Sequence, residues 1–365
     1  MIKLVKPFIA DSEIMMSEIQ RVLYSGYIAS GKEVDDLENI LKAYIGSENF
    51  FCLSSGTAAL HIALILAGVQ NGDEVISTAM TAEPTNTTIA LTGAKIVWAD
   101  VDPKTGLIDP SDIENKITKK TKAIMVVHYA GMVCDMDKIN NISQKYNIPV
   151  IEDAAHAFGA GYNGKKVGCN SKYTCFSFQA IKLMTTVDGG GLIVNNATEE
   201  ELERVRRLRW FGLDKKTSRL ANDIKEAGYK YTMNNINAVI GKVQMEEFST
   251  VLSKHISNGQ FYDEKLKDIP GIQLVPYYEK TEPAYWLYTL RVEDRREDFI
   301  KKLNEEGIEA SQLHHRSDTH SVFSDSKCEL KGLDDFYSHF VHIPCGWWVT
   351  DDDRQRIINV IKCGW

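Results

Sequence analysis

Lys182 is the only charged residue in the stretch CFSFQAIKLMTTV, which covers residues 175–187. Burial lowers the pKa of a lysine because the charged amine loses its hydration. A neutral amine can attack a carbonyl group and form a Schiff base. The apolar surroundings therefore make Lys182 a candidate nucleophile, although such a stretch also suits a lysine whose amine reaches past its neighbours into solvent.

Two other stretches carry groups that could work beside this lysine. In SSGTAAL, residues 54–60, a strand is expected to stop, a glycine turns the chain and a helix begins. The first N–H groups of a helix, here those of Gly56 and Thr57, can bind an anion, although a glycine before a helix also serves as a plain cap. In VIEDAAHAFGA, residues 150–160, Asp153 ends an apolar strand, where it either meets a cation or caps a helix.

Taken together, the three stretches meet the needs of one cofactor. Pyridoxal phosphate requires a phosphate cradle, a carboxylate that keeps its ring nitrogen protonated, and a lysine that holds its aldehyde. The chain supplies these groups in the same order: Gly56 with Thr57 for the cradle, Asp153 for the carboxylate and Lys182 for the lysine. The combination indicates a pyridoxal-phosphate enzyme.

These residues need a scaffold that brings them to one place. Short β-rich runs alternate with helical patterns from residue 50 to about 195, which predicts a parallel sheet with crossover helices. All three stretches lie at the carboxyl ends of predicted strands, where functional groups of such sheets gather. The predicted strands are FFCLS near 50, EVIST near 74, KIVWADV near 95, KAIMVVH near 122, PVIED near 149, TCFSF near 174 and GLIVNN near 191.

The pattern becomes mainly helical after residue 200, and a long helix is predicted over about 235–267. Beyond it, a few strands alternate with helices in a smaller unit. We expect a large cofactor-binding domain over residues 1–248 and a small C-terminal domain over residues 249–365.

The composition excludes several classes of protein. The 365 residues are 44% hydrophobic, as in a globular protein with a large core. The formal net charge of -8 argues against a nucleic-acid partner. Seven cysteines without a C-x-x-C pair fit a reducing cytosol. The longest apolar stretch, at 58–69, is too short to cross a bilayer and the N-terminus shows no signal-peptide pattern, so we expect a cytoplasmic protein without a membrane partner.

The chain resembles the DegT/DnrJ/EryC1/StrS sugar aminotransferase family of pyridoxal-phosphate enzymes over nearly its full length. The resemblance implies an α/β fold of the aspartate-aminotransferase type (fold type I), with a mostly parallel central sheet, helices on both faces and a small C-terminal α/β domain. It also implies a homodimer with shared active sites. The matching stretches are SGYIASGKEVDDLE (25–38), SSGTAALHIAL (54–64), GAKIVWADVDPKTGLID (93–109), IEDAAHAFGA (151–160), FSFQAIKLMTTVDGGGL (176–192) and LRWFGLD (208–214).

Members of this family move an amino group from L-glutamate to a keto sugar carried on a nucleotide diphosphate. The resemblance therefore implies an aminotransferase whose cofactor alternates between pyridoxal phosphate and pyridoxamine phosphate. The expected acceptor is a 4-keto-6-deoxy sugar. The product would be an amino sugar nucleotide for surface polysaccharide, such as lipopolysaccharide O-antigen, or for other glycoconjugates.

Carried over position by position, Lys182 resembles the family's Schiff-base lysine, Asp153 the partner of the pyridine nitrogen, and His156 the residue beside the cofactor ring. These three are the expected catalytic residues. Ala82 stands where the family usually stacks an aromatic residue on the ring. The resemblance places Lys230 at the cofactor phosphate of the neighbouring subunit, and a surface lysine in a loop is the alternative. The expected phosphate cup consists of Ser55, Gly56, Thr57 and Ser177.

The histidine-rich stretch LHHRSDTHSVF, residues 313–323, lies near the substrate according to the resemblance. Arg316 could bind a diphosphate with two N–H groups, and a solvated loop is the alternative. No metal is expected, because no histidine pair has the helical zinc spacing. The expected substrate-binding residues are Tyr27, Tyr285, Trp286, His314, His315, Arg316 and His320. For Tyr285 and Trp286, packing within the small domain is the alternative.

Four further positions depart from the family pattern. Gln179 stands where histidine is common, Asp188 replaces glutamate, Lys230 replaces asparagine and Thr232 replaces arginine. These departures leave the cofactor prediction intact and bear on the choice of substrate and amino donor.

Three other functions compete with amino transfer. A pyridoxamine-phosphate-dependent sugar dehydratase of the same fold would have histidine in place of Lys182. A non-catalytic cofactor-binding regulatory protein would need a partner surface such as a DNA-binding helix, and the sequence shows no such pattern. A dinucleotide-binding oxidoreductase is disfavoured, because the three glycines at 189–191 precede a strand and no G-x-G-x-x-G motif occurs.

Overall fold

Seven strands form the central sheet of the computed structural model, which describes residues 1–365, in the order β1-β9-β8-β5-β4-β2-β3. β9 runs antiparallel to both of its neighbours, and the other six strands run parallel to one another. The predicted mostly parallel sheet is therefore confirmed. The bounds are β1 Phe50–Leu53, β2 Glu74–Ser77, β3 Lys95–Trp98, β4 Thr121–Val127, β5 Val150–Asp153, β8 Tyr173–Ser177 and β9 Gly190–Val194.

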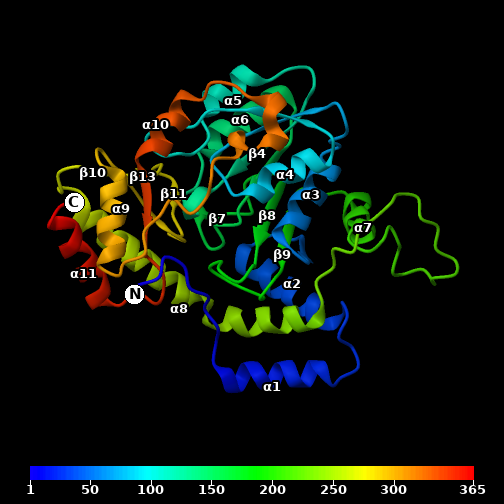
Figure 1. Cartoon of the computed structure of the whole chain (residues 1–365). Coiled ribbons are helices and arrows are strands. Elements are labelled where there is room, and N and C mark those ends of the chain that lie inside the picture. The colour runs from blue at the N-terminus through cyan, green and yellow to red at the C-terminus, as the bar shows by residue number, and fades with distance from the viewer.

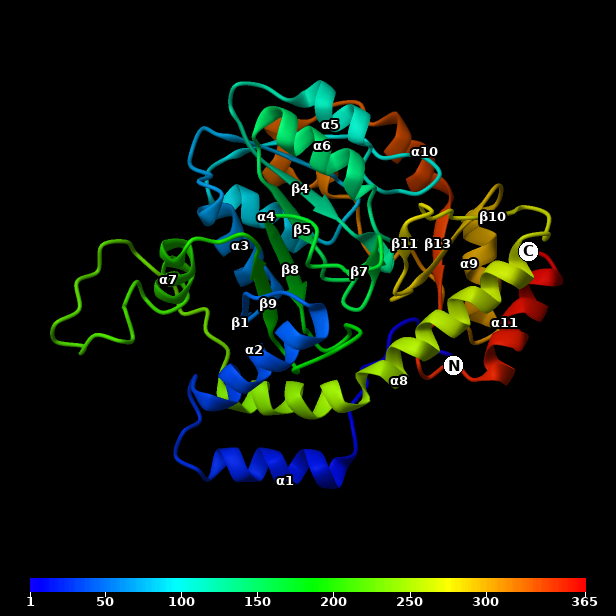
Figure 2. The same cartoon turned by 180° about the vertical axis from the view of Figure 1, so that it is seen from behind.

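Helices connect these strands and lie on both sides of the sheet (Figures 1 and 2). None of the helices is long and apolar enough to cross a membrane. The helices that precede or connect the strands are α1 Ser12–Leu23, α2 Lys32–Ile45, α3 Gly56–Leu66, α4 Glu83–Leu91, α5 Pro110–Lys116, α6 Met136–Tyr146 and α7 Glu199–Leu208. A small sheet beside them contains β6 Gly161–Tyr162, β7 Lys165–Lys166 and β11 Thr281–Glu282.

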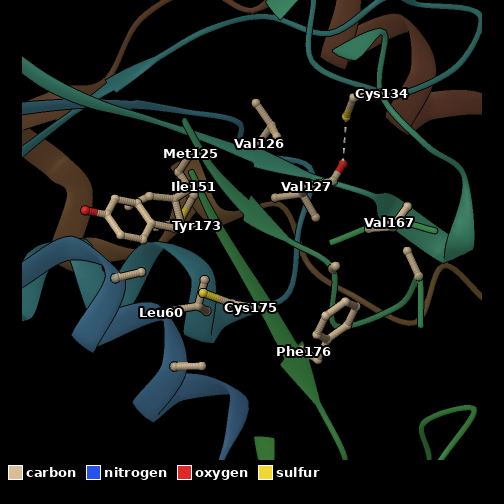
Figure 3. Packing of buried hydrophobic residues seen from close by; sticks show 14 of the residues in the cluster. Leu60, Met125, Val126, Val127, Cys134, Ile151, Val167, Tyr173, Cys175 and Phe176 are labelled. Atoms are coloured by element: carbon tan, nitrogen blue, oxygen red, sulfur yellow. Dashed lines mark hydrogen bonds between the residues drawn. The ribbon is translucent and has the colours of Figure 1, made fainter. Parts of the chain in front are cut away.

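The central strands β4, β5 and β8 are almost entirely buried and carry mostly apolar side chains, because both faces of the sheet are covered. Met125 of β4, Ile151 of β5 and Cys175 of β8 are all buried. Figure 3 shows this packing at close range, with Leu60 of α3 and Cys175 on one side of the strands. A layer of buried side chains therefore holds the strand ends, and the polar residues that follow them, in fixed positions.

The long helix α8 Asn235–Leu266 leads from the large core to a smaller one (Figure 2). Phe248 and Leu252 of α8 belong to the large core, and Tyr262 and Leu266 belong to the small core. The expected domain limit at 248/249 falls inside this helix. The small unit contains β10 Ile272–Leu274, β12 Tyr288–Val292, β13 Phe340–Ile343, α9 Arg296–Glu305 and α11 Asp351–Lys362.

Two segments pack into the unit that is farther from them along the chain. Ile2 pairs with Ile308 and is buried in the small core. In the opposite direction, Phe323 and Phe336 pack into the large core. These two belong to η3 Ser321–Ser326 and α10 Lys331–His339, which follow η2 Ser317–Thr319.

Leu37 of α2 is fully buried at the point where this helix packs against α8. Replacing it with alanine removes buried methyl groups and leaves a cavity, so Leu37→Ala should lower the free energy of unfolding by about 2–5 kcal/mol. Urea unfolding followed by circular dichroism measures the change. The matched control is Leu91→Ala, because Leu91 is 68% exposed at the end of α4 and should cost no more than about 0.5 kcal/mol. Equal losses in both variants would contradict this account of the core.

Candidate active site

The carboxyl ends of β1, β5 and β8 share one edge of the sheet, because these strands are parallel. Leu53 at the end of β1 and Ser177 at the end of β8 both pair with Gly190, the first residue of the reversed strand β9. Asp153 at the end of β5 pairs with Cys175, so it lies one strand further along the same edge. A cavity of about 310 Å³ opens here. Nine of the predicted site residues line it: Ser55, Gly56, Thr57, Ala82, Asp153, His156, Ser177, Lys182 and His314.

The amino end of α3 forms an anion cradle in this cavity. The Ala58 N–H donates to Ser55 Oγ at 3.1 Å, whereas the N–H groups of Gly56 and Thr57 have no acceptor within the helix. A Cβ atom on Gly56 would lie 2.9 Å from the Cβ of Ser177, and one on Gly190 would lie 2.3 Å from the carbonyl carbon of Ser55. Only glycines allow the start of α3, the end of β8 and the start of β9 to approach this closely. The close approach leaves backbone N–H groups facing the cavity, where they can bind a phosphate.

Asp153 is a buried carboxyl group with two donors. The hydroxyl of Thr85 donates to its Oδ2 at 2.6 Å, and the Ala155 N–H donates to its Oδ1 at 3.1 Å. Burial raises the pKa of Asp153, and these two hydrogen bonds oppose that rise. The carboxylate can therefore pair with a cationic nitrogen placed in the cavity.

Lys182 follows β8 and directs its amine to the same cavity. Burial lowers the pKa of Lys182 to about 8, although the charge of Asp153 acts in the opposite direction. The amine lies 4.2 Å from the centroid of the Trp286 ring, and the Trp286 indole N–H donates to the Ile181 carbonyl at 2.9 Å. This indole supports the segment that carries the amine. About a tenth of Lys182 is therefore neutral at pH 7, far more than for a lysine of ordinary pKa, and the neutral amine is the nucleophile.

Two imidazoles stand beside this lysine. The His156 ring stacks on Trp286 with centroids 3.9 Å apart, and the His314 ring is parallel to His156 at 5.7 Å. The Ala130 N–H donates to His156 Nδ1 at 3.3 Å, so this nitrogen carries no proton. Burial lowers the pKa of His156 well below its usual value and that of His314 to about 4. Both rings are therefore neutral and offer flat surfaces to a planar ligand.

The other predicted site residues lie outside the cavity lining of this chain. The Trp286 ring packs against the amine of Lys182. The Tyr285 hydroxyl donates to Asp263 at 2.6 Å, within the small unit. Arg316 binds both carboxylate oxygens of Asp318 at 2.8 Å and also pairs with Asp334.

Four more of them lie at or near the surface. The His315 ring hydrogen-bonds to Thr319, and His320 packs edge-on against His315. Tyr27 is 81% exposed. The amine of Lys230 donates to the Thr232 hydroxyl at 3.1 Å, and this lysine is exposed. The substrate roles of these residues, and that of Lys230 at a phosphate, stay predictions.

The sequence interpretation missed Thr81, Glu83 and Thr85, which also line the cavity. Thr81 directly precedes Ala82, the cap of α4, and Thr85 lies in the first turn of this helix. Threonine hydroxyls near a helix start usually bond to the local backbone, so the sequence alone could not reveal that Thr85 reaches Asp153 and that Thr81 bonds to Thr85. No group of three or more His, Cys, Asp or Glu side chains is arranged to hold a metal ion.

The cavity residues fit pyridoxal phosphate. Lys182 offers an amine of lowered pKa for the aldehyde, Asp153 a buried carboxylate for the ring nitrogen, and His156 a flat surface for the ring. Gly56 and Thr57 supply free N–H groups for the phosphate.

Comparisons with known proteins agree with this chemistry. The model of the DegT/DnrJ/EryC1/StrS aminotransferase family matches residues 10–362. The UDP-4-amino-4-deoxy-L-arabinose–oxoglutarate aminotransferase of Shewanella sediminis is 34% identical over 98% of this chain and 97% of its own length. The crystal structure of the sugar aminotransferase CalS13 from Micromonospora echinospora has a TM-score of 0.96 at 34% identity, covering 100% of both chains.

A related structure from Streptococcus pneumoniae has been solved in its pyridoxal-phosphate form, with a TM-score of 0.90 at 28% identity over 99% of this chain and 98% of that one. Its pyridoxamine-phosphate form superimposes with a TM-score of 0.91. These matches agree with the amine, carboxylate and anion cradle found in the cavity. The protein is a sugar aminotransferase with a pyridoxal-phosphate cofactor and the type I fold, and the chain belongs to the DegT/DnrJ/EryC1/StrS aminotransferase family.

Proposed function

We propose that this aminotransferase moves the amino group of L-glutamate to a keto sugar carried on a nucleotide diphosphate, and that it does so as a cytoplasmic homodimer. The observation that carries the proposal is the meeting of Lys182, Asp153 and the α3 anion cradle in one cavity. The name of the Shewanella relative gives a UDP-linked amino sugar and oxoglutarate, the keto acid that glutamate leaves behind. A 4-keto-6-deoxy sugar is the acceptor we expect.

Pyridoxal phosphate, when bound, supplies an aldehyde for the amino group and a ring that accepts electron density from the donor carbon. Lys182 would hold the aldehyde until the amino group of the donor displaces it, and the freed amine would then move a proton to and from the reacting carbon as general base and acid. Asp153 would keep the ring nitrogen protonated. His156 would cover one face of the ring, and Ser177 with the α3 N–H groups would bind the phosphate.

The cavity favours amino transfer over dehydration by a related enzyme. A pyridoxamine-phosphate-dependent dehydratase needs no covalent lysine, whereas the amine of Lys182 is buried in the cavity and takes part in no salt bridge. A purely regulatory protein would not need a lysine pKa of about 8, which suits proton transfer near neutral pH.

Side chains near the cavity mouth support a polar acceptor. His314 lines the cavity, and Glu83 adds a carboxylate that could accept hydrogen bonds from sugar hydroxyls. Arg316 would bind a diphosphate only by exchanging its contacts with Asp318 and Asp334 for the ligand.

Three features support the homodimer and the cytoplasmic location. Lys230 is exposed and lies outside the cavity of its own chain, as a residue that completes a neighbouring site would. Exposed apolar side chains gather on α1 and the turn after it, at Ile14, Met16, Leu23, Tyr24, Tyr27 and Ile28. A partner subunit would cover such a surface. All seven cysteines are free thiols, as expected in a reducing compartment.

A panel of keto sugar nucleotides tests the proposed function. The protein is first converted to its pyridoxamine-phosphate form with glutamate, and each compound is then added while the return of the aldehyde form is followed by absorbance. We expect the aldehyde form to return with at least one nucleotide-linked keto sugar and with none of the free sugars. Return of the aldehyde form with simple keto acids alone would contradict the proposed acceptor.

The pH dependence of cofactor capture tests the role of Lys182. Only the neutral amine attacks the aldehyde, and the pKa of Lys182 is lowered to about 8. The rate at which cofactor-free protein binds pyridoxal phosphate covalently should therefore rise about tenfold per pH unit below this value and level off above it. Stopped-flow absorbance measures the rate. Lys182→Ala should show no covalent capture and no turnover, and a rate that keeps rising past pH 10 would contradict the lowered pKa.

Mixed dimers test the placement of Lys230. Lys230→Ala should weaken cofactor binding about 10- to 100-fold, because a hydrogen bond to a charged phosphate is lost. Lys215→Ala is the matched control, since Lys215 also lies over the Trp210 ring. Mixing Lys230→Ala with Lys182→Ala should restore activity, because the chain with an intact Lys182 receives Lys230 from its partner. Proven subunit exchange without recovery would show that Lys230 does not act across the interface.

A further inference from the structure

Two threonine hydroxyls form a chain that ends on the carboxylate of Asp153. The hydroxyls of Thr81 and Thr85 are 2.6 Å apart, and the Thr85 hydroxyl lies 2.6 Å from Asp153 Oδ2. Thr81 is 2% exposed and Thr85 is 1% exposed. All three residues line the cavity, so this chain of hydrogen bonds lies beside the position expected for the cofactor ring.

The direction of these hydrogen bonds follows from the number of protons. An ionised carboxylate can only accept, so Thr85 donates its single hydroxyl proton to Asp153. The oxygen of Thr85 is then free to accept the proton of Thr81. Both donors point toward the negative charge, and each polarises the next, so the second bond strengthens the first.

The fold holds these hydroxyls in place from outside the cavity. Asn86, next to Thr85 on α4, accepts from the Ser77 hydroxyl at 2.7 Å and donates to the Thr78 carbonyl at 3.0 Å. Ser77 is the last residue of β2, so these bonds pin the start of α4 to the sheet. The backbone around Thr81 and Thr85 therefore has little freedom to turn the hydroxyls away.

Other groups around Asp153 act on its charge as well. Burial raises the pKa of Asp153, the Thr85 hydroxyl opposes this most strongly, and the charges of Lys182 and His128 lower it further. Cys175 on the neighbouring strand is a buried thiol with a raised pKa, and burial keeps His156 uncharged. Among the uncharged neighbours, the Thr85 hydroxyl and the Ala155 N–H donate to the carboxylate.

We propose that Thr81 and Thr85 are positioning residues that keep Asp153 ionised in its buried site and thereby keep the ring nitrogen of the cofactor protonated. The inference rests on the pyridoxal-phosphate cofactor and does not depend on the identity of the sugar or the amino donor. A local structural role is the alternative. Thr88 on the same helix has such a role, since its hydroxyl donates to the Thr85 carbonyl at 2.8 Å and it is fully buried.

Threonine-to-valine variants test the proposal, because valine keeps the shape and removes only the hydroxyl. The variants are Thr85→Val, Thr81→Val and the control Thr88→Val, each loaded with pyridoxal phosphate whose ring nitrogen carries an NMR-active isotope. The chemical shift of that nitrogen reports its protonation without any substrate. We expect a shift toward the neutral ring in Thr85→Val, a smaller one in Thr81→Val, and none in Thr88→Val or in the conservative Thr85→Ser.

The loss of one hydrogen bond to a charged group should raise the proton affinity of Asp153 about 10- to 100-fold. The pH at which the ring nitrogen loses its proton should fall accordingly in Thr85→Val. An unchanged nitrogen shift in Thr81→Val and in folded, cofactor-loaded Thr85→Val would overturn the proposal, and so would equal shifts in all three valine variants. If Thr85→Val does not fold, Thr81→Val decides the question alone. Because no sugar or glutamate is present, a wrong sugar substrate would leave this result unaffected.

Discussion

Burying a carboxylate and an amine in the same cavity is the constraint on which this structure depends. Each charged group loses hydration when it leaves water, and the two do not form a salt bridge that would offset the loss. The structure compensates for the lost hydration differently at each group. Asp153 receives two hydrogen-bond donors, whereas the pKa of Lys182 falls to about 8 so that its amine is easily neutralised. A site with these two protonation states can hold a cationic ring nitrogen and attack an aldehyde at the same time.

The sheet topology supplies the geometry that this constraint requires. Parallel strands place the ends of β5 and β8 at one edge, and the reversed strand β9 brings Gly190 between the ends of β1 and β8. Gly190 has no side chain to clash with Ser55, and Gly56 has none to clash with Ser177, so the start of α3 packs closely on both strands. The phosphate cradle therefore forms next to the carboxylate and the amine. Trp286 follows α8 in the chain but packs in the large core. Its ring centroid lies 4.2 Å from the Lys182 amine and its indole N–H donates to the Ile181 carbonyl, so the lysine segment is supported by a side chain from beyond α8.

Much of this arrangement could be predicted from the sequence, because it follows from local patterns. The strands and the helix now seen at Asn235–Leu266 have clear sequence patterns. Asp153 ends a predicted strand, and Gly56 and Lys182 follow shortly after two others, so their positions could be predicted. Contacts between distant segments could not be predicted in the same way. Arg316 pairs with Asp318 and Asp334, Tyr285 binds Asp263, and Thr85 binds Asp153, and each of these pairings depends on tertiary packing. The domain limit and the partner of Lys230 stay predictions for the same reason.

We propose that the protein takes an amino group from glutamate and holds it on the cofactor, which Lys182 releases when the amino group is transferred. The most direct test is a single incubation of the cofactor-loaded protein with L-glutamate and no sugar, followed by counting oxoglutarate released per site. The account predicts one oxoglutarate per site, loss of the lysine-bound absorbance at the same rate, and then no further release. An absence of oxoglutarate, or continued release without any acceptor, would contradict it.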